Sequence, residues 1–160
     1  VLGADTIVFH GGEILGKPRD FAHACEMVRR LAGSSHEVYT GLALAGPDGR
    51  GLESSYEVTA VRFRELSQEE IELYVNTEKP YDKAGAYAIQ HPQFRPVVMS
   101  SNHHTGMDGC YASVMGLPMC HVLLLMRKMG LQPNVEFFEG CETLLEYQCP
   151  VSNMILSGER

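Results

Sequence analysis

The sequence predicts a mixed α/β fold, and two kinds of segment predict it. Stretches rich in β-branched and aromatic residues, which suit pleated strands, occupy residues 1–9, 36–45 and 54–63. Apolar residues repeat at three- and four-residue spacing behind Asp20, and a capping box begins at Ser67, which are both signs of helices. A chain of 160 residues fits one domain, and its periodicity alone indicates only a mixture of helices and strands.

The chain is expected to open with a hairpin and a helix. Residues 1–9 and 13–15 form two strands joined through Gly11 and Gly12, whose freedom at positive φ allows a tight turn. Asp20 is expected to cap a helix that Gly33 ends. The apolar face of this helix comprises Phe21, Ala24, Met27, Val28 and Leu31.

The middle of the chain predicts a long antiparallel strand pair and then a short helix. The strands at 36–45 and 54–63 flank the turn-rich residues 46–51. Ser67 and Glu70 have the spacing of a capping box, so a helix is expected to begin there. Glu78, Lys79 and Pro80 then interrupt it.

The last part of the chain predicts two further strands, a loop and a helix. Residues 84–90 and 110–115 carry strand character, and residues 91–109 are rich in turn-forming residues. Pro118 suits the first turn of a helix that ends near Gly130. We expect residues 1–133 to form the domain and 134–160 to form a C-terminal extension. In that extension a packed helix is expected to carry Phe137, Phe138, Leu144, Leu145 and Tyr147.

Composition narrows the class of protein. A net charge of −7 argues against broad nucleic-acid binding, which needs a basic surface, so no nucleic-acid partner is expected. The five cysteines are an odd number without CxxC spacing, which favours reduced thiols and a cytoplasmic protein. The longest apolar run, residues 122–126, is too short to span a bilayer, so no membrane partner is expected. The oligomeric state stays open, with a homodimer among the alternatives.

The first candidate site residues lie in and after the N-terminal strand. Asp5 and Thr6 interrupt an apolar strand, so we expect them at the edge of the core and in need of partners. Asp5 either satisfies backbone amides, or holds a divalent metal and takes a proton from an attacking water. Lys17 ends a near match to a phosphate-binding P-loop, but Pro18 replaces the required hydroxyl residue, so that motif is rejected. Lys17 is then either a solvated loop lysine or a phosphate ligand.

A second group of candidates lies near the expected strand at 84–90. Asp82 and Lys83 precede Gly85, where backbone can approach a ligand closely. They form either a surface ion pair or one side of a ligand site. Gln90 could read a base edge, because its amide offers both a donor and an acceptor.

Two other sets of side chains are interpreted as structural. Potential zinc ligands gather at His103, His104, Asp108 and Cys110. Their spacing matches no zinc finger, so we do not expect a metal there. Cys25 is expected to pack in the core rather than act as a nucleophile, because no motif places a histidine beside it.

Four segments together resemble the Maf family of nucleoside triphosphate pyrophosphatases. They are residues 1–8 (VLGADTIV), 16–20 (GKPRD), 82–90 (DKAGAYAIQ) and 114–118 (VMGLP), in the family's order. The resemblance implies a Maf/ITPase-like fold, with an elongated, curved sheet, flanking helices and a nucleotide cleft between two lobes. It also implies hydrolysis between the α and β phosphates, which yields a nucleoside monophosphate and pyrophosphate and so sanitises nucleotide pools.

The resemblance also implies roles for individual residues. Asp5 matches the family's catalytic acid, and Lys17, Asp82 and Lys83 match the rest of its catalytic set. Asp5 and Asp82 would hold the divalent metal, Mg²⁺ or Mn²⁺. Thr6 and Gln90 match the branch of the family that prefers dTTP and UTP as substrates.

Two departures from the family motivate a competing hypothesis. The segment after Gln90 lacks the family's glycine-rich, aliphatic character. The family's Ser-x-Ser-Pro-Arg-Arg phosphate-binding loop is expected upstream of Val1, and it does not occur in these residues. The competing hypothesis is a catalytically silent nucleotide-binding or interaction module, with reduced affinity for the triphosphate.

Overall fold

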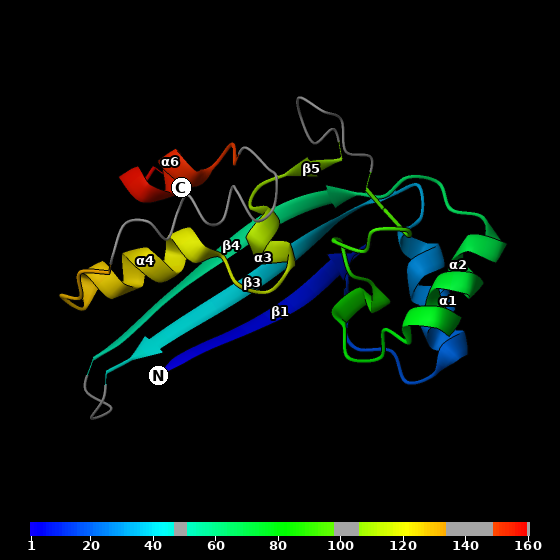
Figure 1. Ribbon diagram of the computed structural model, residues 1–160, viewed down its shortest axis with the longest axis horizontal. Coiled ribbons are helices and arrows are strands. Elements are labelled where there is room, and N and C mark those ends of the chain that lie inside the picture. The colour runs from blue at the N-terminus through cyan, green and yellow to red at the C-terminus, as the bar shows by residue number, and fades with distance from the viewer. Residues whose placement is uncertain (47–50, 98–105, 134–148, 160) are drawn as a thin grey trace. The chain divides into compact units, whose positions relative to one another are not determined.

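The computed structural model describes residues 1–46, 51–97, 106–133 and 149–159, and it confirms a mixed α/β fold (Figure 1). Its elements are β1 (Leu2–His10), β2 (Glu13–Leu15), α1 (Phe21–Leu31), β3 (Ser35–Ala45), β4 (Leu52–Arg62), α2 (Gln68–Glu78), the 3₁₀ helix η1 (Ala84–Ala86), β5 (Met107–Asp108), α3 (Tyr111–Val114), α4 (Met119–Lys128) and α6 (Ser152–Ser157). In the described residues, no helix has the length and hydrophobicity to cross a membrane.

The strands form one sheet in the order β2-β1-β3-β4-β5. β1 and β2 pair antiparallel, with Val8 opposite Leu15, and β4 pairs antiparallel with β5. Val1 and Ala45 exchange two backbone hydrogen bonds, of 2.7 and 2.8 Å, which is the pattern of an antiparallel pair between the first and third strands. The expected hairpin is confirmed, and Gly11 and Gly12 have φ values of 59° and 87° in its turn.

The chain divides into two compact units. Unit 1 consists of Val1–Thr6, Tyr39–Val58 and Gly109–Arg160, and unit 2 consists of Ile7–Val38 and Thr59–Asp108. The unit boundaries fall inside β1, β3 and β4, so each of these strands contributes residues to both units.

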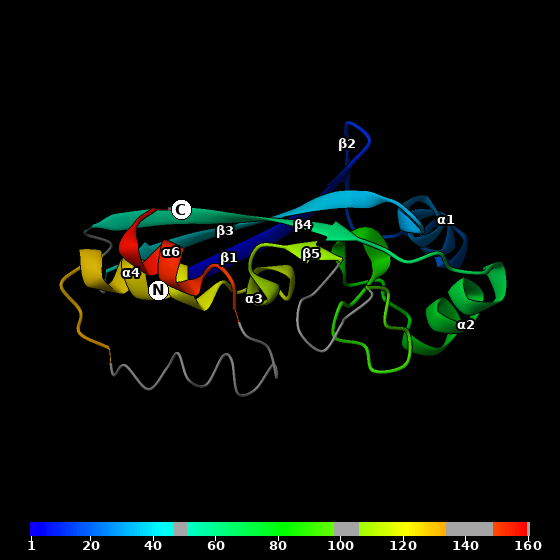
Figure 2. The same cartoon turned by 90° about the horizontal axis from the view of Figure 1, so that it is seen from above.

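In unit 1, α3 and α4 lie on one face of β3 and β4 (Figure 2). Leu42 of β3 packs against Val122 and Leu125 of α4. A second apolar cluster joins α3, α4 and α6 through Cys110, Ala112, Cys120, Val151 and Ile155. Segments far apart in the sequence therefore share the core of this unit.

A buried polar contact also holds α4 to β4. His121 Nε2 lies 2.9 Å from Glu57 Oε2, and His121 Nδ1 lies 2.9 Å from Ser55 Oγ. The side chains of His121 and Glu57 are 5% and 2% exposed, so water does not compete for this hydrogen bond.

In unit 2, α1 packs against α2 and η1 beside a cluster of rings. His36, Phe63 and Tyr87 meet edge to face, with ring centroids 4.7 to 5.4 Å apart. His36 Nε2 also lies 2.8 Å from the hydroxyl oxygen of Tyr87. Edge-to-face pairs of this kind contribute about 0.5–1.5 kcal/mol each beyond their buried area.

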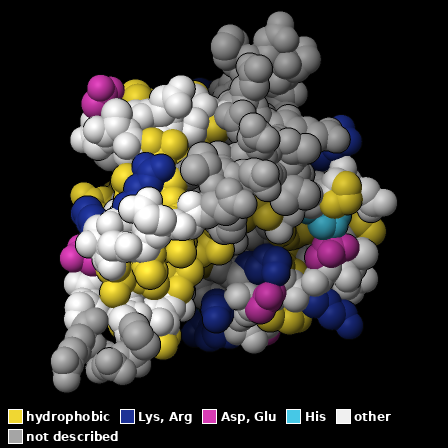
Figure 3. Space-filling model, turned by 60° about the vertical axis from the view of Figure 1, so that its left-hand side comes forward, with side chains coloured by type: hydrophobic (Ala, Val, Ile, Leu, Met, Phe, Trp, Pro, Cys, Tyr) yellow, Lys and Arg dark blue, Asp and Glu magenta, His cyan; other side chains and the backbone are white. Residues whose placement is uncertain are grey.

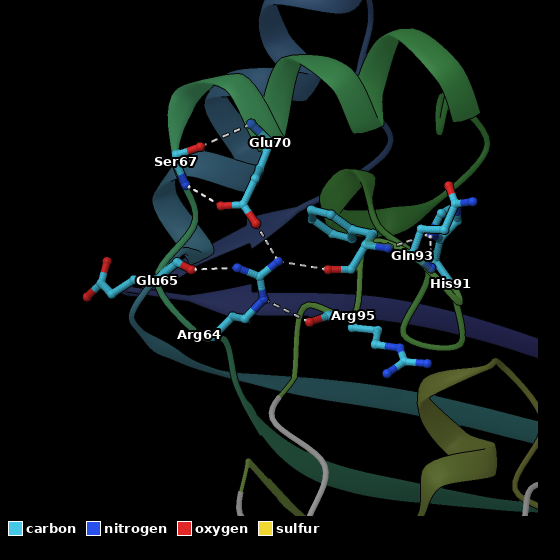
Figure 4. A network of polar contacts seen from close by, with 8 residues as sticks. Arg64, Glu65, Ser67, Glu70, His91, Gln93 and Arg95 are labelled. Atoms are coloured by element: carbon cyan, nitrogen blue, oxygen red, sulfur yellow. Dashed lines mark hydrogen bonds and ion pairs between the residues drawn. The ribbon is translucent and has the colours of Figure 1, made fainter.

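Arg64 connects three segments of unit 2 just after β4 (Figure 4). Its guanidinium donates to the carbonyl oxygens of Phe94 and Arg95 and, at 2.7 Å, to the Glu70 carboxylate. Glu70 also accepts the Ser67 amide proton, and the Ser67 hydroxyl accepts from the Glu70 amide, so the expected capping box is confirmed. The hydrogen bond from Arg64 lowers the pKa of Glu70, with the Ser67 amide adding to the effect.

The strand expected at residues 84–90 is wrong. The structure has η1 at Ala84–Ala86 and turns beyond it, with Gly85 at a φ of 68°. A positive φ is incompatible with an extended strand, and the Ala86 amide instead donates back to the Lys83 carbonyl at 3.1 Å.

The strand expected at residues 110–115 is wrong as well, because Tyr111–Val114 form α3. The Ser113 amide and hydroxyl both donate to the Cys110 carbonyl, at 3.1 and 2.7 Å. These local bonds take the place of a strand ladder. In the loop expected at 91–109, Met107–Asp108 add β5, and residues 98–105 lie outside the described part.

The other expected elements are confirmed where they are described. Asp20 caps α1, and its carboxylate accepts the His23 amide proton at 2.8 Å. The long strand pair and α4 also match the expectation. The helix expected around residues 137–147 lies outside the described residues, whereas α6 was not expected.

His36 makes the stability of the fold depend on pH. Burial, with a smaller contribution from His10, lowers the pKa of His36 to about 3. As the pH falls, His36 therefore takes up a proton at a higher pH in the unfolded state than in the folded state. The free energy of unfolding should then fall as the pH drops below about 6.5, by up to about 1.4 kcal/mol per pH unit. Urea unfolding between pH 7 and 5 should show this slope, and His36→Phe should reduce it.

His23→Gln is the matched control, because it replaces a more exposed histidine of α1. That variant should keep the slope of the unmodified protein. An equal slope in the His36→Phe protein would assign the pH dependence to another group.

Candidate functional site

Asp5 lies on β1 in unit 1, and its side chain is exposed rather than set at the edge of the core. The expectation of a partly buried Asp5 is therefore wrong: the residues at the start of β1 are exposed, and burial begins at Thr6. Asp5 Oδ1 accepts the Thr6 amide proton at 2.9 Å. This bond orients a carboxylate that water and cations can reach.

Thr6 is the half-buried end of a chain of hydrogen bonds. Its Oγ1 lies 2.8 Å from Thr40 Oγ1, and the Thr40 hydroxyl donates to the Ser113 carbonyl oxygen at 2.7 Å. Thr40 is completely buried, so its hydroxyl depends on these partners. The same Ser113 carbonyl accepts the Gly116 amide proton at 2.9 Å.

Gly116 borders the Thr6 hydroxyl and belongs to the VMGLP segment that carries the family resemblance. Its φ is 102°, and a Cβ at this position would lie 3.6 Å from Thr6 Oγ1. A glycine here keeps the neighbourhood of that hydroxyl free of a side chain. Thr40 and Ser113 were missed by the sequence analysis, although Thr40 continues the alternation of buried residues through Val38 and Leu42.

Unit 2 brings together Lys17, Asp82 and Lys83. Lys83 Nζ lies 2.9 and 3.1 Å from the two carboxylate oxygens of Asp82. The hydrogen bond from Lys83 lowers the pKa of Asp82. Burial partly opposes this, and the charge of Lys83 and, more weakly, that of Lys17 add to the lowering. Exposed ion pairs stabilise a fold by only about 0–1 kcal/mol, so this group adds little to folding.

Gly85 connects the two loops that carry these charges. Its amide donates to the Gly16 carbonyl at 3.1 Å, directly before Lys17. A Cβ at position 85 would lie 3.1 Å from Val8 Cγ2 and 3.3 Å from the Tyr87 ring, and φ is positive. Both the close approach and the backbone conformation therefore require glycine.

Gln90 is exposed in a turn of unit 2, where its amide meets solvent. Its neighbours are held in place. The Ala88 amide donates to the Tyr74 hydroxyl at 3.0 Å, and His91 accepts the Phe94 amide proton at 2.8 Å through Nδ1. The backbone on both sides of Gln90 is thus positioned while its side chain stays free to turn.

The remaining candidate residues are two buried cysteines and two histidines. Cys25 is buried on α1, which confirms a packing role, and burial raises the pKa of its thiol. Cys110 is buried beside α4 and α6, and burial raises the pKa of its thiol to about 12. His103 and His104 lie outside the described residues. Within the described ranges, no group of three or more His, Cys, Asp or Glu is arranged to hold a metal ion.

The candidate residues thus fall into two sets. Unit 1 carries Asp5 and Thr6, and unit 2 carries Lys17, Asp82, Lys83 and Gln90. On the face drawn in Figure 3, lysine and arginine side chains lie in small groups among hydrophobic and acidic ones.

Comparison with known proteins gives the family. The model of the family described as "Maf-like protein" matches residues 1–129. This chain belongs to the Maf-like protein family. The match therefore covers most of the chain and not only the four short segments named above.

Curated relatives of this Maf-like protein carry the name dTTP/UTP pyrophosphatase. The relative from Hahella chejuensis is 43% identical over 132 residues, covering 82% of this chain and 61% of the relative. The relative from Koribacter versatilis is 45% identical, covering 82% and 63%, and that from Geobacter sulfurreducens is 47% identical, covering 81% and 64%. The chain thus spans about 61–64% of the length of these relatives.

Replacing Gly85 tests how tightly the two charged loops are joined. Gly85→Ala should lower the free energy of unfolding by about 1–3 kcal/mol, because it adds both backbone strain and crowding against Val8. Gly11→Ala is the matched control, since Gly11 has a φ of 59° with open space around its Cβ position. Urea denaturation should show the larger loss of unfolding free energy in Gly85→Ala. Equal losses in the two variants would contradict a contribution from crowding against Val8.

Proposed function

We propose that this Maf-like protein hydrolyses nucleoside triphosphates, preferably dTTP and UTP, to the monophosphate and pyrophosphate. Membership of the family and the 43–47% identity to relatives named dTTP/UTP pyrophosphatase support the proposal. The structural observation that carries it is that the positive charges of Lys17 and Lys83 both act on the Asp82 carboxylate. The two ammonium groups suit a polyphosphate, and the carboxylate suits a cation. Such an activity would remove unwanted nucleotides from the cell's pool.

Asp5 is the proposed general base. Its carboxylate is exposed, and the Thr6 amide holds one of its oxygens at 2.9 Å. In the proposed reaction Asp5 takes a proton from the water that attacks the α-phosphorus. A positioned general base typically contributes about 10²- to 10⁴-fold to the rate.

Lys17 and Lys83 are proposed to bind the leaving pyrophosphate. Each ammonium group offers three donors, and the negative charge on the leaving group grows as the bond to the α-phosphorus breaks. Lys83 engages both oxygens of Asp82, so it is already oriented by a neighbouring anion. An ammonium group oriented in this way, as Lys83 is, would stabilise the developing charge with less reorganisation than a free one.

Asp5 and Asp82 are proposed to hold the expected metal, Mg²⁺ or Mn²⁺. Asp5 and Asp82 offer exposed oxygen ligands, and the lowered pKa of Asp82 keeps its carboxylate ionised. Mg²⁺ is commonly held by one or two carboxylates together with substrate phosphates, so a larger protein cluster is not needed. When bound, the ion would lower the pKa of a coordinated water and offset phosphate charge.

Thr6 and Gln90 are proposed to select the base. Gln90 presents an exposed amide, which can pair with both the carbonyl and the N–H of a pyrimidine edge. We further propose that residues 1–133 form the catalytic domain, with 134–160 as an extension. The net charge of −7 supports a protein without nucleic-acid partners, and we place it in the cytoplasm, away from membranes, as a monomer or homodimer.

Asp5→Asn tests the catalytic assignment. The substitution keeps the size and exposure of the side chain but removes the base, so kcat for dTTP should fall by about 10²- to 10⁴-fold. Pyrophosphate release in the presence of Mg²⁺ measures this. Asp108→Asn, at an exposed aspartate of β5, is the control and should leave kcat unchanged.

Turnover by the Asp5→Asn protein at the unmodified rate would remove Asp5 from the mechanism. The unmodified protein must itself release pyrophosphate for the enzyme proposal to stand. If it binds dTTP in calorimetry without releasing pyrophosphate, the catalytically silent nucleotide-binding module would be the correct function.

Gln90→Glu tests the base preference. A carboxylate can only accept, so it would face the pyrimidine carbonyl without a donor. We expect the unmodified protein to prefer dTTP and UTP over GTP, and Gln90→Glu to lower kcat/KM for dTTP and UTP by about 5- to 150-fold. Gln93→Glu, also exposed and three residues further along, is the matched control and should keep the ranking. An unchanged ranking in the Gln90→Glu protein would contradict the assignment.

A further inference from the structure

Ser55, Glu57 and His121 form a hydrogen-bonded series of side chains in unit 1. Ser55 and Glu57 are two residues apart on β4, so their side chains share the face of the sheet on which α4 lies. His121 on α4 lies between them, with Nδ1 2.9 Å from Ser55 Oγ and Nε2 2.9 Å from Glu57 Oε2. None of these three residues belongs to the candidate site of the proposed function.

The partners of His121 determine where its proton lies. A carboxylate can only accept, so Nε2 carries the proton and donates it to Glu57. In the neutral ring Nδ1 is then an acceptor, and the Ser55 hydroxyl is the donor in its contact with Nδ1. A serine hydroxyl that donates to a histidine, itself oriented by a carboxylate, is the arrangement that activates serine as a nucleophile.

A cavity gives a substrate access to Ser55. The cavity has a volume of about 540 Å³ and borders residues 54–58 and His121. Ser54 and Tyr56 point to the opposite face of the sheet from Ser55, so a cavity that borders all three runs along an edge of β4. Ligand pockets in proteins commonly have volumes of about 300–1,000 Å³, so this cavity suits a small organic molecule.

The Tyr56 amide is directed toward the same edge of β4. The Arg62 amide donates to the Gly106 carbonyl on the side of β4 where β5 pairs. Successive amides of a strand alternate between its two edges, so the Tyr56 amide points to the same edge as that of Arg62. The backbone amide of the residue after the nucleophile is an oxyanion donor in one large class of serine hydrolases.

We propose that Ser55 is the nucleophile of a second active site, which hydrolyses small carboxylic esters, with His121 as its general base and Glu57 as a positioning residue. Ser55 Oγ bonds to the ester carbonyl carbon while its proton passes to His121 Nδ1. The bond from that carbon to the alcohol oxygen breaks, and the alcohol leaves with the proton. Water then cleaves the acyl-serine by the same route, so one ester and one water give one acid and one alcohol.

Labelling with a fluorophosphonate tests the nucleophile on the unmodified protein. Such a reagent forms a bond between its phosphorus and an activated serine oxygen, and fluoride leaves. The folded protein should carry one phosphonyl group, which peptide mass spectrometry should locate on Ser55, and protein unfolded in urea should carry none. No label on the folded protein, a label on another serine, or equal labelling after unfolding would overturn the proposal.

His121→Gln tests the general base. Glutamine keeps a polar side chain between Ser55 and Glu57 but cannot take the proton, so the labelling rate should fall by about 10²- to 10⁴-fold. Ser34→Ala is the matched control, because Ser34 is also half-buried but its hydroxyl donates to the Leu31 carbonyl, which is no base. This control should be labelled at the unmodified rate. A folded His121→Gln protein labelled at that rate would contradict the role of His121.

Glu57→Gln separates positioning from a purely structural contact. The amide keeps the shape of the side chain but lacks the charge that stabilises the imidazolium formed during the reaction. The maximum labelling rate should therefore fall, while the fluorophosphonate concentration that gives half of this rate should stay the same. A change in that concentration alone would assign Glu57 to the shape of the cavity and overturn its role in the reaction.

Hydrolysis of p-nitrophenyl butyrate tests the complete reaction. The unmodified protein should release p-nitrophenolate through many turnovers, and Ser55→Ala should abolish this release. Equal release by the Ser55→Ala protein would assign the hydrolysis to another group and overturn the proposal. This activity does not rest on the proposed function, so its failure would leave nucleoside triphosphate hydrolysis untouched.

Discussion

The buried faces of β3 and β4 carry polar side chains, and the need to pair them governs the structure. His36 reaches the Tyr87 hydroxyl, Thr40 reaches the Ser113 carbonyl, and Glu57 reaches His121, over sequence separations of 51, 73 and 64 residues. A buried polar group without a partner costs about 1–3 kcal/mol, more than a hydrogen bond normally contributes, so each pairing selects one arrangement of distant segments. Apolar packing stabilises the units, whereas these bonds specify which segment meets which strand.

The proposed chemistry uses the same polar interior. Thr40 is completely buried, and its hydroxyl donates to the Ser113 carbonyl oxygen and lies 2.8 Å from the accessible Thr6 hydroxyl. Asp82 in unit 2 depends on its lysine neighbours for a lowered pKa. In both places an accessible group is held by a residue beside it, which is how proteins commonly prepare sites for charge or polarity changes.

Local sequence signals predicted much of the fold, because the hairpin glycines, the Asp20 cap and the capping box at Ser67 act within a few residues. Residues 84–90 were misassigned because their conformation depends on distant contacts, such as the bond from the Gly85 amide to the Gly16 carbonyl. Residues 110–115 were misassigned because the Ser113 amide and hydroxyl bond locally to the Cys110 carbonyl, which the strand-like composition does not reveal. The charged members of the candidate site could be chosen from motifs. Thr40 could not, because a threonine in a strand is ordinary and its importance lies in a carbonyl 73 residues away.

The long separations between polar partners also shape how the chain must fold. During synthesis, β3 and β4 are complete well before Ser113 and His121 are made, so Thr40 and Glu57 have to wait for their partners. Contacts this distant in sequence slow folding, because a long loop must close before the contact forms. Until then the nascent strands expose a sheet face, and transiently exposed surface of this kind favours aggregation.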